Sequence, residues 1–408
     1  MTRYLTMSLA AAVALAACDS DKVVNPPATS LNTGLFKSYV AIGNSITAGY
    51  QSGGILDSTQ QESFAALLAH AAGTRYAYPA LLTPGCPPPI VNFQTGARLG
   101  NGTSTTCVGR DPSKVNAILN NVAVPGLAVA DLTSDTTTNS NALETFILGG
   151  KTEIQKALDA QPTFVTVEIG NNDLLPAALA GLPFYASPVP DTDIAYQPNI
   201  TPLDSFSVQY ARAINALTTA RPGLKGVLLG VFNVTLVPAL TPVDSLIGDP
   251  VLFGEFQAAV GHAVGIQPDC INAHALISGL EYITYNHEQG NYINFIDCSD
   301  GGPFTLDQNK QNVIVTYVNA YNGYIKAKAD SIGFAYVDPN LLLLGLRAQG
   351  QIPLVPNFAS ATQPFGAYVT LDGIHPSAAA HQLIAAALIA KIDSMYGVSI
   401  SAERVAAR

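Results

Sequence analysis

Two short patterns at opposite ends of the chain carry side chains that could act together on a carbonyl group. Ser45 closes the pattern Gly43-Asn44-Ser45, directly after an apolar run, and Asp372 stands three residues before His375. A carboxylate at that spacing can hold one imidazole nitrogen and leave the other free to accept a hydroxyl proton. These three residue types indicate a serine nucleophile, a histidine base and an orienting acid.

Two further patterns could stabilise the negative oxygen that such an attack creates. Gly126 follows an apolar run, and its backbone amide can approach a substrate because no side chain intervenes. Asn172, in Gly170-Asn171-Asn172-Asp173, offers an uncharged side-chain donor. Each pattern also has an ordinary structural interpretation as a turn or a helix cap.

The elements expected around these patterns alternate along the chain. Apolar, β-branched runs predict buried strands, and longer periodic stretches predict helices. The expected strands are 38–43, 121–124, 163–169, 225–232 and 334–338, and the expected helices are 62–72, 142–160, 205–220, 306–332 and 376–396. This alternation predicts the α/β class: a three-layer α/β/α sandwich with a flavodoxin-like parallel sheet of about five strands. All four patterns would then lie at one edge of the sheet, where ligands bind in such folds.

The order Ser, Gly, Asn, Asp-x-x-His resembles the GDSL/SGNH hydrolase superfamily. Gly43-Asn44-Ser45 is similar to its first block, Gly126 to the second, Gly170-x-Asn172-Asp173 to the third and Asp372-x-x-His375 to the fifth. The resemblance extends over about residues 38–396. It implies Ser45 as nucleophile, His375 as base, Asp372 as its acid, and an oxyanion hole of the Ser45 and Gly126 amides with the Asn172 side chain. The implied reaction is hydrolysis of carboxylic esters through an acyl-serine.

Two residues near these blocks are unusual. The first block of the superfamily usually reads Gly-Asp-Ser, whereas Asn44 stands here in the middle position. Glu168 lies inside an expected buried strand, so it is either a paired core carboxylate or a pocket-lining group.

The first residues predict export rather than folding. Arg3 precedes an apolar stretch that ends in Leu15-Ala16-Ala17-Cys18, which is too short to span a bilayer permanently and resembles a bacterial lipobox. We expect a signal peptide at 1–17, lipidation of Cys18 and a polar tether over 18–35. An ordinary signal peptide with an incidental cysteine is the alternative. The lipobox predicts a lipoprotein of the bacterial cell envelope, attached to a membrane through its N-terminal lipid.

Composition and cysteine count limit the partners, disulfides and cofactors that the remaining chain can have. Only 12% of the 408 residues are charged and the net charge is −10, so we expect a sizeable core and no nucleic-acid partner. Four cysteines remain after Cys18, and in an exported chain they predict two disulfides, for which we favour Cys86–Cys107 and Cys270–Cys298. No CxxC, HExxH or His-rich cluster occurs, so we expect neither metal nor other cofactor.

The hydrolase domain is expected over 36–397, followed by a tail at 398–408. Pro- and aromatic-rich stretches at about 176–204 and 233–302 are too long for simple connections and predict insertions packed over the functional edge, either as lids that contact substrate or only as cover for apolar surface. The main hypothesis is a lipid-anchored esterase or lipase. The alternatives are an inactive binding or adhesive lipoprotein on the same fold and a carbohydrate O-acetyl esterase.

Overall fold

The computed structural model describes residues 22–24, 34–110, 117–134, 142–181, 200–288 and 293–406. The predicted signal peptide and Cys18 lie outside these residues, as do most of the tether and the greater part of the insertion expected at 176–204. Within the described part, no helix has the length and apolar character that a membrane span needs.

A parallel sheet forms the centre of the main body. Its strands are β2 (Tyr39–Gly43), β4 (Phe164–Glu168), β5 (Lys225–Leu229) and β11 (Ala335–Val337), hydrogen-bonded in the order β11-β5-β4-β2. In β2 and β4 every residue is buried, which explains why these strands read as unbroken apolar runs.

The strand expected at 121–124 is less regular than predicted. Residues 121–124 run beside β2 and bond to it through Val122 N to Ala41 O (3.0 Å) and Val124 N to Gly43 O (3.1 Å). Only one ladder pair, Ala41 with Asn121, has strand geometry. The Asn121 side chain turns back to the amide of Ala123, so it competes with a continued ladder.

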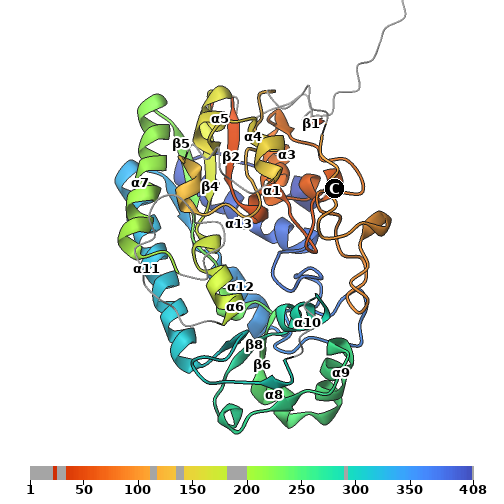
Figure 1. The fold of residues 1–408 in the computed structure, drawn as a ribbon. Coiled ribbons are helices and arrows are strands. Elements are labelled where there is room, and N and C mark those ends of the chain that lie inside the picture. Colours follow the sequence, from red (N-terminus) through yellow and green to blue (C-terminus); the bar gives the residue numbers. More distant parts are fainter. Residues whose placement is uncertain are drawn as a thin grey trace, which may run out of the picture.

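Helices cover both faces of this sheet. Alternate residues of β2 point to opposite sides: Tyr39 and Ala41 join one core cluster, and Val40 and Ile42 join the other. The first cluster packs against α3 (Phe64–Ala72) and α13 (Ala378–Tyr396). Across the sheet, the covering helices are α4 (Ala142–Leu148), α5 (Glu153–Asp159), α7 (Leu203–Ala220) and α11 (Gln308–Ile332). The three layers confirm the predicted α/β/α sandwich (Figure 1).

Some helix boundaries differ from the prediction. The single helix expected at 142–160 is two helices, because Gly149 and Gly150 both adopt positive φ and break it. The helix expected at 376–396 begins only at Ala378, where the Ser377 side chain accepts a hydrogen bond from the amide of Ala380.

The described residues between 240 and 306 form a smaller lobe below the sheet in Figure 1. It has its own core, with Phe256, Ile277 and Tyr282 fully buried, and contains the disulfide Cys270–Cys298. Its elements are β6 (Leu240–Pro242), α8 (Val243–Gly248), α9 (Pro250–Val260), β7 (Gly265–Ile266), η6 (Pro268–Cys270), β8 (Leu276–Ser278), α10 (Gly279–Glu288), β9 (Phe295–Ile296) and β10 (Thr305–Leu306). The insertion expected at 233–302 is therefore largely an ordered lobe with its own three-stranded sheet, of order β10-β8-β6.

Short elements complete the described chain. They are β1 (Lys22–Val24), α1 (Ser45–Ala48), α2 (Asp57–Gln61), β3 (Tyr76–Tyr78), η1 (Leu99–Asn101), η3 (Val129–Leu132), η4 (Asn171–Asp173), α6 (Leu175–Ala180), η5 (Val234–Leu236), α12 (Asn340–Ala348) and α14 (Glu403–Ala406). Strand β1 pairs antiparallel with β3, so part of the predicted tether joins the folded body. The second predicted disulfide, Cys86–Cys107, is also present.

Candidate active site

Ser45 lies on a tight turn between β2 and α1. Strand β2 ends at Gly43, and the Asn44 side chain caps α1 by accepting a hydrogen bond from the Ile46 amide at 3.2 Å. Ser45 is the first residue of the helix and is 9% exposed. Its own amide donates to none of the described residues. The hydroxyl and this free amide therefore both stand at the carboxyl end of a central strand.

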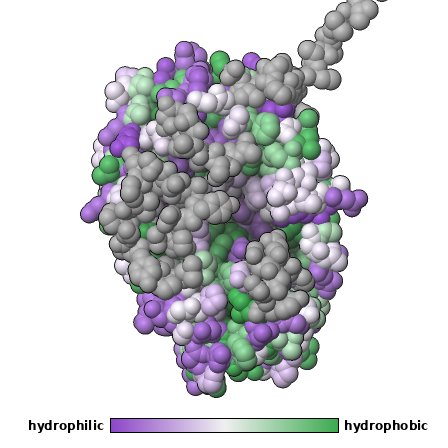
Figure 2. All heavy atoms as spheres, in the orientation of Figure 1, coloured by the Kyte–Doolittle hydropathy of each residue, from purple (hydrophilic) through white to green (hydrophobic). Residues whose placement is uncertain are grey.

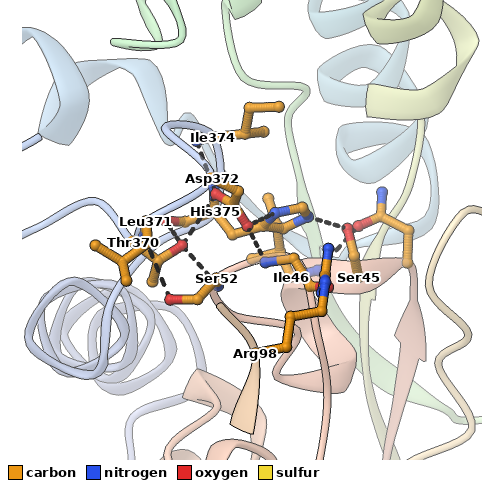
Figure 3. A network of polar contacts seen from close by, with 11 residues as sticks. Ser45, Ile46, Ser52, Arg98, Thr370, Leu371, Asp372, Ile374 and His375 are labelled. Carbon is orange, nitrogen blue, oxygen red and sulfur yellow. Dashed lines mark hydrogen bonds and ion pairs between the residues drawn. The ribbon is translucent and has the colours of Figure 1, made fainter. Parts of the chain in front are cut away.

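The structure brings Ser45, His375 and Asp372 into one hydrogen-bonded chain, as the sequence predicted. His375 Nε2 lies 2.9 Å from Ser45 Oγ, and His375 Nδ1 lies 2.8 Å from Asp372 Oδ2 (Figure 3). The Tyr50 ring packs against the imidazole with centroids 4.9 Å apart. With Nδ1 donating to the carboxylate, Nε2 is left to accept the serine proton.

Asp372 accepts five hydrogen bonds. Oδ1 accepts from the amides of Ile374 and His375 (both 2.9 Å) and from the Thr370 hydroxyl (3.0 Å), while Oδ2 accepts from His375 Nδ1 and the Gly53 amide (2.7 Å). Burial by itself would raise the pKa of Asp372, but His375 and these donors hold that pKa well below its usual value. The carboxylate therefore stays ionised beside the imidazole at any physiological pH.

The two neighbouring asparagines have different surroundings. Asn171 uses both ends of its amide in the scaffold, donating to Glu168 Oε1 and accepting from the Phe232 amide at 2.9 Å. Asn172 donates one N–H to Leu127 O at 2.8 Å and lines the same pocket as Ser45 and His375. A primary amide has two N–H groups, so Asn172 retains one for a ligand.

Gly126 lies at this same edge. It is exposed, with φ of 90°, and its amide donates to none of the residues that the structure describes. The bond from Val124 to Gly43 and the bond from Asn172 to Leu127 fix the chain on either side of it. The three predicted oxyanion donors therefore come from turns that adjoin one another.

Buried carboxyl groups lie behind the Ser45 turn. Glu168 is fully buried, and its carboxyl accepts from Thr47 Oγ1 at 3.0 Å and from Asn171. It is therefore a hydrogen-bonded core carboxyl, and it is not among the residues that line the pocket. Glu153, also buried, accepts from the Gly43 amide at 2.6 Å. Burial raises the pKa of Glu168 to about 8 and that of Glu153 well above its usual value.

An apolar pocket opens beside Ser45 and His375, with about 750 Å³ of free space including its mouth. Apolar side chains form nearly all of its wall. The lining residues are Ser45, Ile46, Asn171, Asn172, Leu175, Phe232, Val234, Val237, Pro238, Leu342, Leu343, Leu346, Ile352, Tyr368, Val369, Ile374, His375, Pro376, Ala380 and Ile384. On the face drawn in Figure 2, apolar surface is visible in the hollow between the main body and the small lobe. Among the described residues, no group of three or more His, Cys, Asp or Glu could hold a metal ion.

Sequence reasoning missed several residues that support the site. Thr370 and Gly53 hold Asp372, Tyr50 packs on His375, and Glu153 holds the start of the Ser45 turn. Most of these contacts involve backbone amides or lie far apart in the chain. Only the Gly53-Gly54 pair carried a recognisable turn signal.

The buried carboxyls predict that the protein loses stability as the pH rises from about 6.5 to about 8. Burial raises the pKa of Asp173 to about 7 and that of Glu168 to about 8, so the folded protein keeps protons that the unfolded chain has released. Burial also lowers the pKa of His381 to about 3, but its opposing effect ends near pH 6.5, where the unfolded histidine loses its proton. The thermal unfolding midpoint of the wild type should be lower at pH 8 than at pH 6.5, and this decrease should be smaller for Glu168→Gln. Glu255→Gln, in the small lobe, is the control. A midpoint that rises over this range contradicts the prediction.

Comparison with solved structures finds similar but distant chains. An acetylxylan esterase from Geobacillus stearothermophilus, solved as a catalytic mutant, is 12% identical with a TM-score of 0.35, and the match covers 87% of this chain and 93% of that one. An extracellular lipase from Streptomyces rimosus is 13% identical with a TM-score of 0.33, covering 88% of this chain and 98% of that one. No curated protein matches the sequence.

The family comparison covers most of the chain. The family described as GDSL-like lipase/acylhydrolase matches residues 39–388, from the strand that precedes Ser45 to beyond His375. The matched range contains the four-stranded sheet, the small lobe, most of the covering helices and each of the patterns from which the sequence predicted a catalytic site. The chain therefore belongs to the GDSL-like lipase/acylhydrolase family, whose members are ester hydrolases.

Proposed function

We propose that this protein is a serine ester hydrolase that prefers an apolar acyl group and is held by a lipid at the bacterial cell envelope. One observation carries the catalytic part of the proposal. The 2.9 Å contact between Ser45 Oγ and His375 Nε2 stands at the wall of an apolar pocket, with Asp372 behind the imidazole.

The reaction proceeds by acyl transfer to Ser45 and then to water. Ser45 Oγ attacks the carbonyl carbon of the ester while its proton passes to His375 Nε2. The tetrahedral intermediate collapses, the bond to the alcohol oxygen breaks, and His375 gives the proton to that oxygen. Water then repeats the sequence on the acyl-serine, with His375 as its base, and releases the carboxylic acid.

The oxyanion is stabilised by donors that are already in place. The Ser45 and Gly126 amides have no partner among the described residues, and Asn172 has an N–H to spare. Donors held in position before the reaction need no reorganisation as charge develops on the oxygen. Asp372 stays ionised throughout and stabilises the imidazolium that forms beside it.

The character of the pocket favours an apolar acyl chain over an acetyl group on a carbohydrate. Within the described residues, no Asp, Glu, Lys or Arg lines it. A carbohydrate would leave its hydroxyl groups without hydrogen-bond partners on such a wall, which costs free energy. An alkyl chain gains about 0.8 kcal/mol for each methylene that it buries.

The cell-envelope part of the proposal rests on the N-terminal sequence. Leu15-Ala16-Ala17-Cys18 supports signal cleavage and acylation of Cys18. The disulfides Cys86–Cys107 and Cys270–Cys298 support an oxidising compartment, because cytosolic thiols are kept reduced.

Removal of the nucleophile should abolish turnover without unfolding the protein. Ser45→Ala is expected to lower kcat on the order of 10⁶-fold, and Asn172→Ala about 10²–10³-fold because one oxyanion donor is lost. The checks are nitrophenyl ester hydrolysis and covalent labelling by a fluorophosphonate, with Ser331→Ala on the exposed end of α11 as the control. A folded wild type that neither hydrolyses esters nor reacts at Ser45 would favour the inactive binding lipoprotein.

The pocket predicts a rate that grows with acyl length. Across nitrophenyl esters from acetyl to palmitoyl, kcat/KM should rise up to about fourfold per methylene until the pocket is filled. Leu346→Phe, in the pocket wall on α12, should lower the rate for long chains and spare acetyl esters. Leu344→Phe, on the exposed side of the same helix, should leave the profile unchanged. Highest activity on the acetyl ester would instead support the O-acetyl esterase.

Lipidation predicts that the mature protein partitions into detergent or membrane. In a bacterial host, wild type should be recovered in the membrane fraction with an acylated Cys18, whereas Cys18→Ser should be released in soluble form. Fractionation together with mass spectrometry of the N-terminal peptide measures both. An unmodified cysteine in a soluble wild type would show that the segment is an ordinary signal peptide.

A further inference from the structure

The Gly53 amide, in a turn at residues 51–54, donates the one hydrogen bond that Asp372 receives from outside its own loop among the described residues. The other three donors to this carboxylate, Thr370, Ile374 and the His375 amide, belong to its own loop. Gly53 donates from a point 319 residues away in the sequence. The direction of Oδ2, which faces His375 Nδ1, therefore depends on where this turn lies.

Two backbone hydrogen bonds close the turn, from the Gln51 amide to Gly54 O (2.8 Å) and from the Gly54 amide to Gln51 O (3.1 Å), but the residues between them adopt an unfavourable backbone conformation. Ser52 and Gly53 both have positive φ, of 54° and 65°, and Gly54 follows. A serine in this region is strained by about 1–2 kcal/mol, and glycines leave the backbone free to move. Something outside the turn must hold it.

On the Asp372 side, the Ser52 amide donates to Thr370 Oγ1 (2.9 Å) and the Leu371 amide donates to Ser52 Oγ (3.3 Å). Contacts on the opposite side join the turn to a second loop. The Ile90 amide donates to Ser52 O at 2.8 Å, and the Arg98 guanidinium donates through NH1 to Gly53 O (2.7 Å) and to Pro88 O (2.8 Å). Arg98 thus joins the turn to the loop that the disulfide Cys86–Cys107 closes. Figure 3 shows Arg98 beside this network, and it is not among the residues that line the pocket.

We propose that Arg98 is a positioning residue: its guanidinium holds Gly53 against Pro88, so that the Gly53 amide keeps the Asp372 carboxylate aligned with His375. The inference rests on the proposed hydrolase function. The peptide group between Ser52 and Gly53 then accepts from Ile90 on one side and donates to Asp372 on the other. Hydrogen bonds in such a series polarise and strengthen one another.

Kinetics should show a loss of rate without a loss of binding. Arg98→Ala is expected to lower kcat about 10- to 100-fold, because small displacements of catalytic groups cost rates of this size. KM should stay within about twofold, since Arg98 lies outside the pocket. Arg98→Lys keeps the charge but loses the planar fork that joins two carbonyls, so an intermediate rate is expected. Added guanidinium should partly restore Arg98→Ala.

Arg221 offers a matched control. It also donates to two backbone carbonyls, Pro162 O and Gln161 O (both 3.2 Å), but it has no tie to Asp372. Arg221→Ala should retain wild-type kcat and the downfield proton signal of the His375–Asp372 hydrogen bond in NMR spectra. In Arg98→Ala that signal should shift or broaden while the thermal unfolding midpoint stays near that of Arg221→Ala.

Three results would overturn the proposal. These are an unchanged kcat in Arg98→Ala, a loss confined to KM, or a fully active Arg98→Lys, which would assign the effect to charge rather than to position. Failure of the proposed function itself would be distinguishable, because wild type would then lack both ester hydrolysis and phosphonate labelling.

Discussion

The hydrogen bond between Ser45 and His375 joins residues that stand 330 positions apart, and the chemistry requires it. Each partner is placed by a different part of the fold. Ser45 is placed by the end of β2 and the first turn of α1, and His375 by a loop that immediately precedes α13. Helices α3 and α13 pack together on one face of the sheet, which brings the segments that follow Ser45 and His375 side by side. The hydrogen bond is therefore a product of the sheet and its core.

The elements that carry the site could be predicted because they are long, buried and periodic. Strand β4 is apolar over its whole length apart from Thr166 and Glu168, and α13 has a continuous helical pattern. The strands and helices of the small lobe could not be predicted individually, because strands of two or three residues, such as β7 and β10, are too short to show an alternation of apolar and polar residues. The break at Gly149-Gly150 was visible in the sequence and should have divided the helix expected there.

The side chains of the proposed catalytic site could be singled out from residue type and spacing, whereas their supports could not. Gly53 and Arg98 act through backbone atoms of distant loops. Thr370 donates to Asp372 within its own loop and accepts a hydrogen bond from the distant Ser52 amide. Such contacts place no requirement on neighbouring residues, so they leave no pattern in the chain. Asn44 was visible in the sequence as an unusual residue, but its role became apparent only in the structure. Burial raises the pKa of Glu168, and the nearby Asn44 side chain acts in the opposite direction, whereas an acid at position 44 would place a second carboxyl group beside a buried one. Burial already makes ionisation of Glu168 costly, and a second acid in the same buried turn would add repulsion whenever both were ionised, so the uncharged amide suits this position.

The pocket and the reacting groups are built from different parts of the chain. Ser45, Gly126 and Asn172 stand at strand ends, but part of the apolar wall comes from α12, through Leu342, Leu343 and Leu346. Substitutions in α12 can therefore accumulate during evolution without disturbing proton transfer. Exchange of leucines for larger or smaller residues along this one short helix would change the acyl-chain length that the pocket accepts and leave the proton-transfer groups in place.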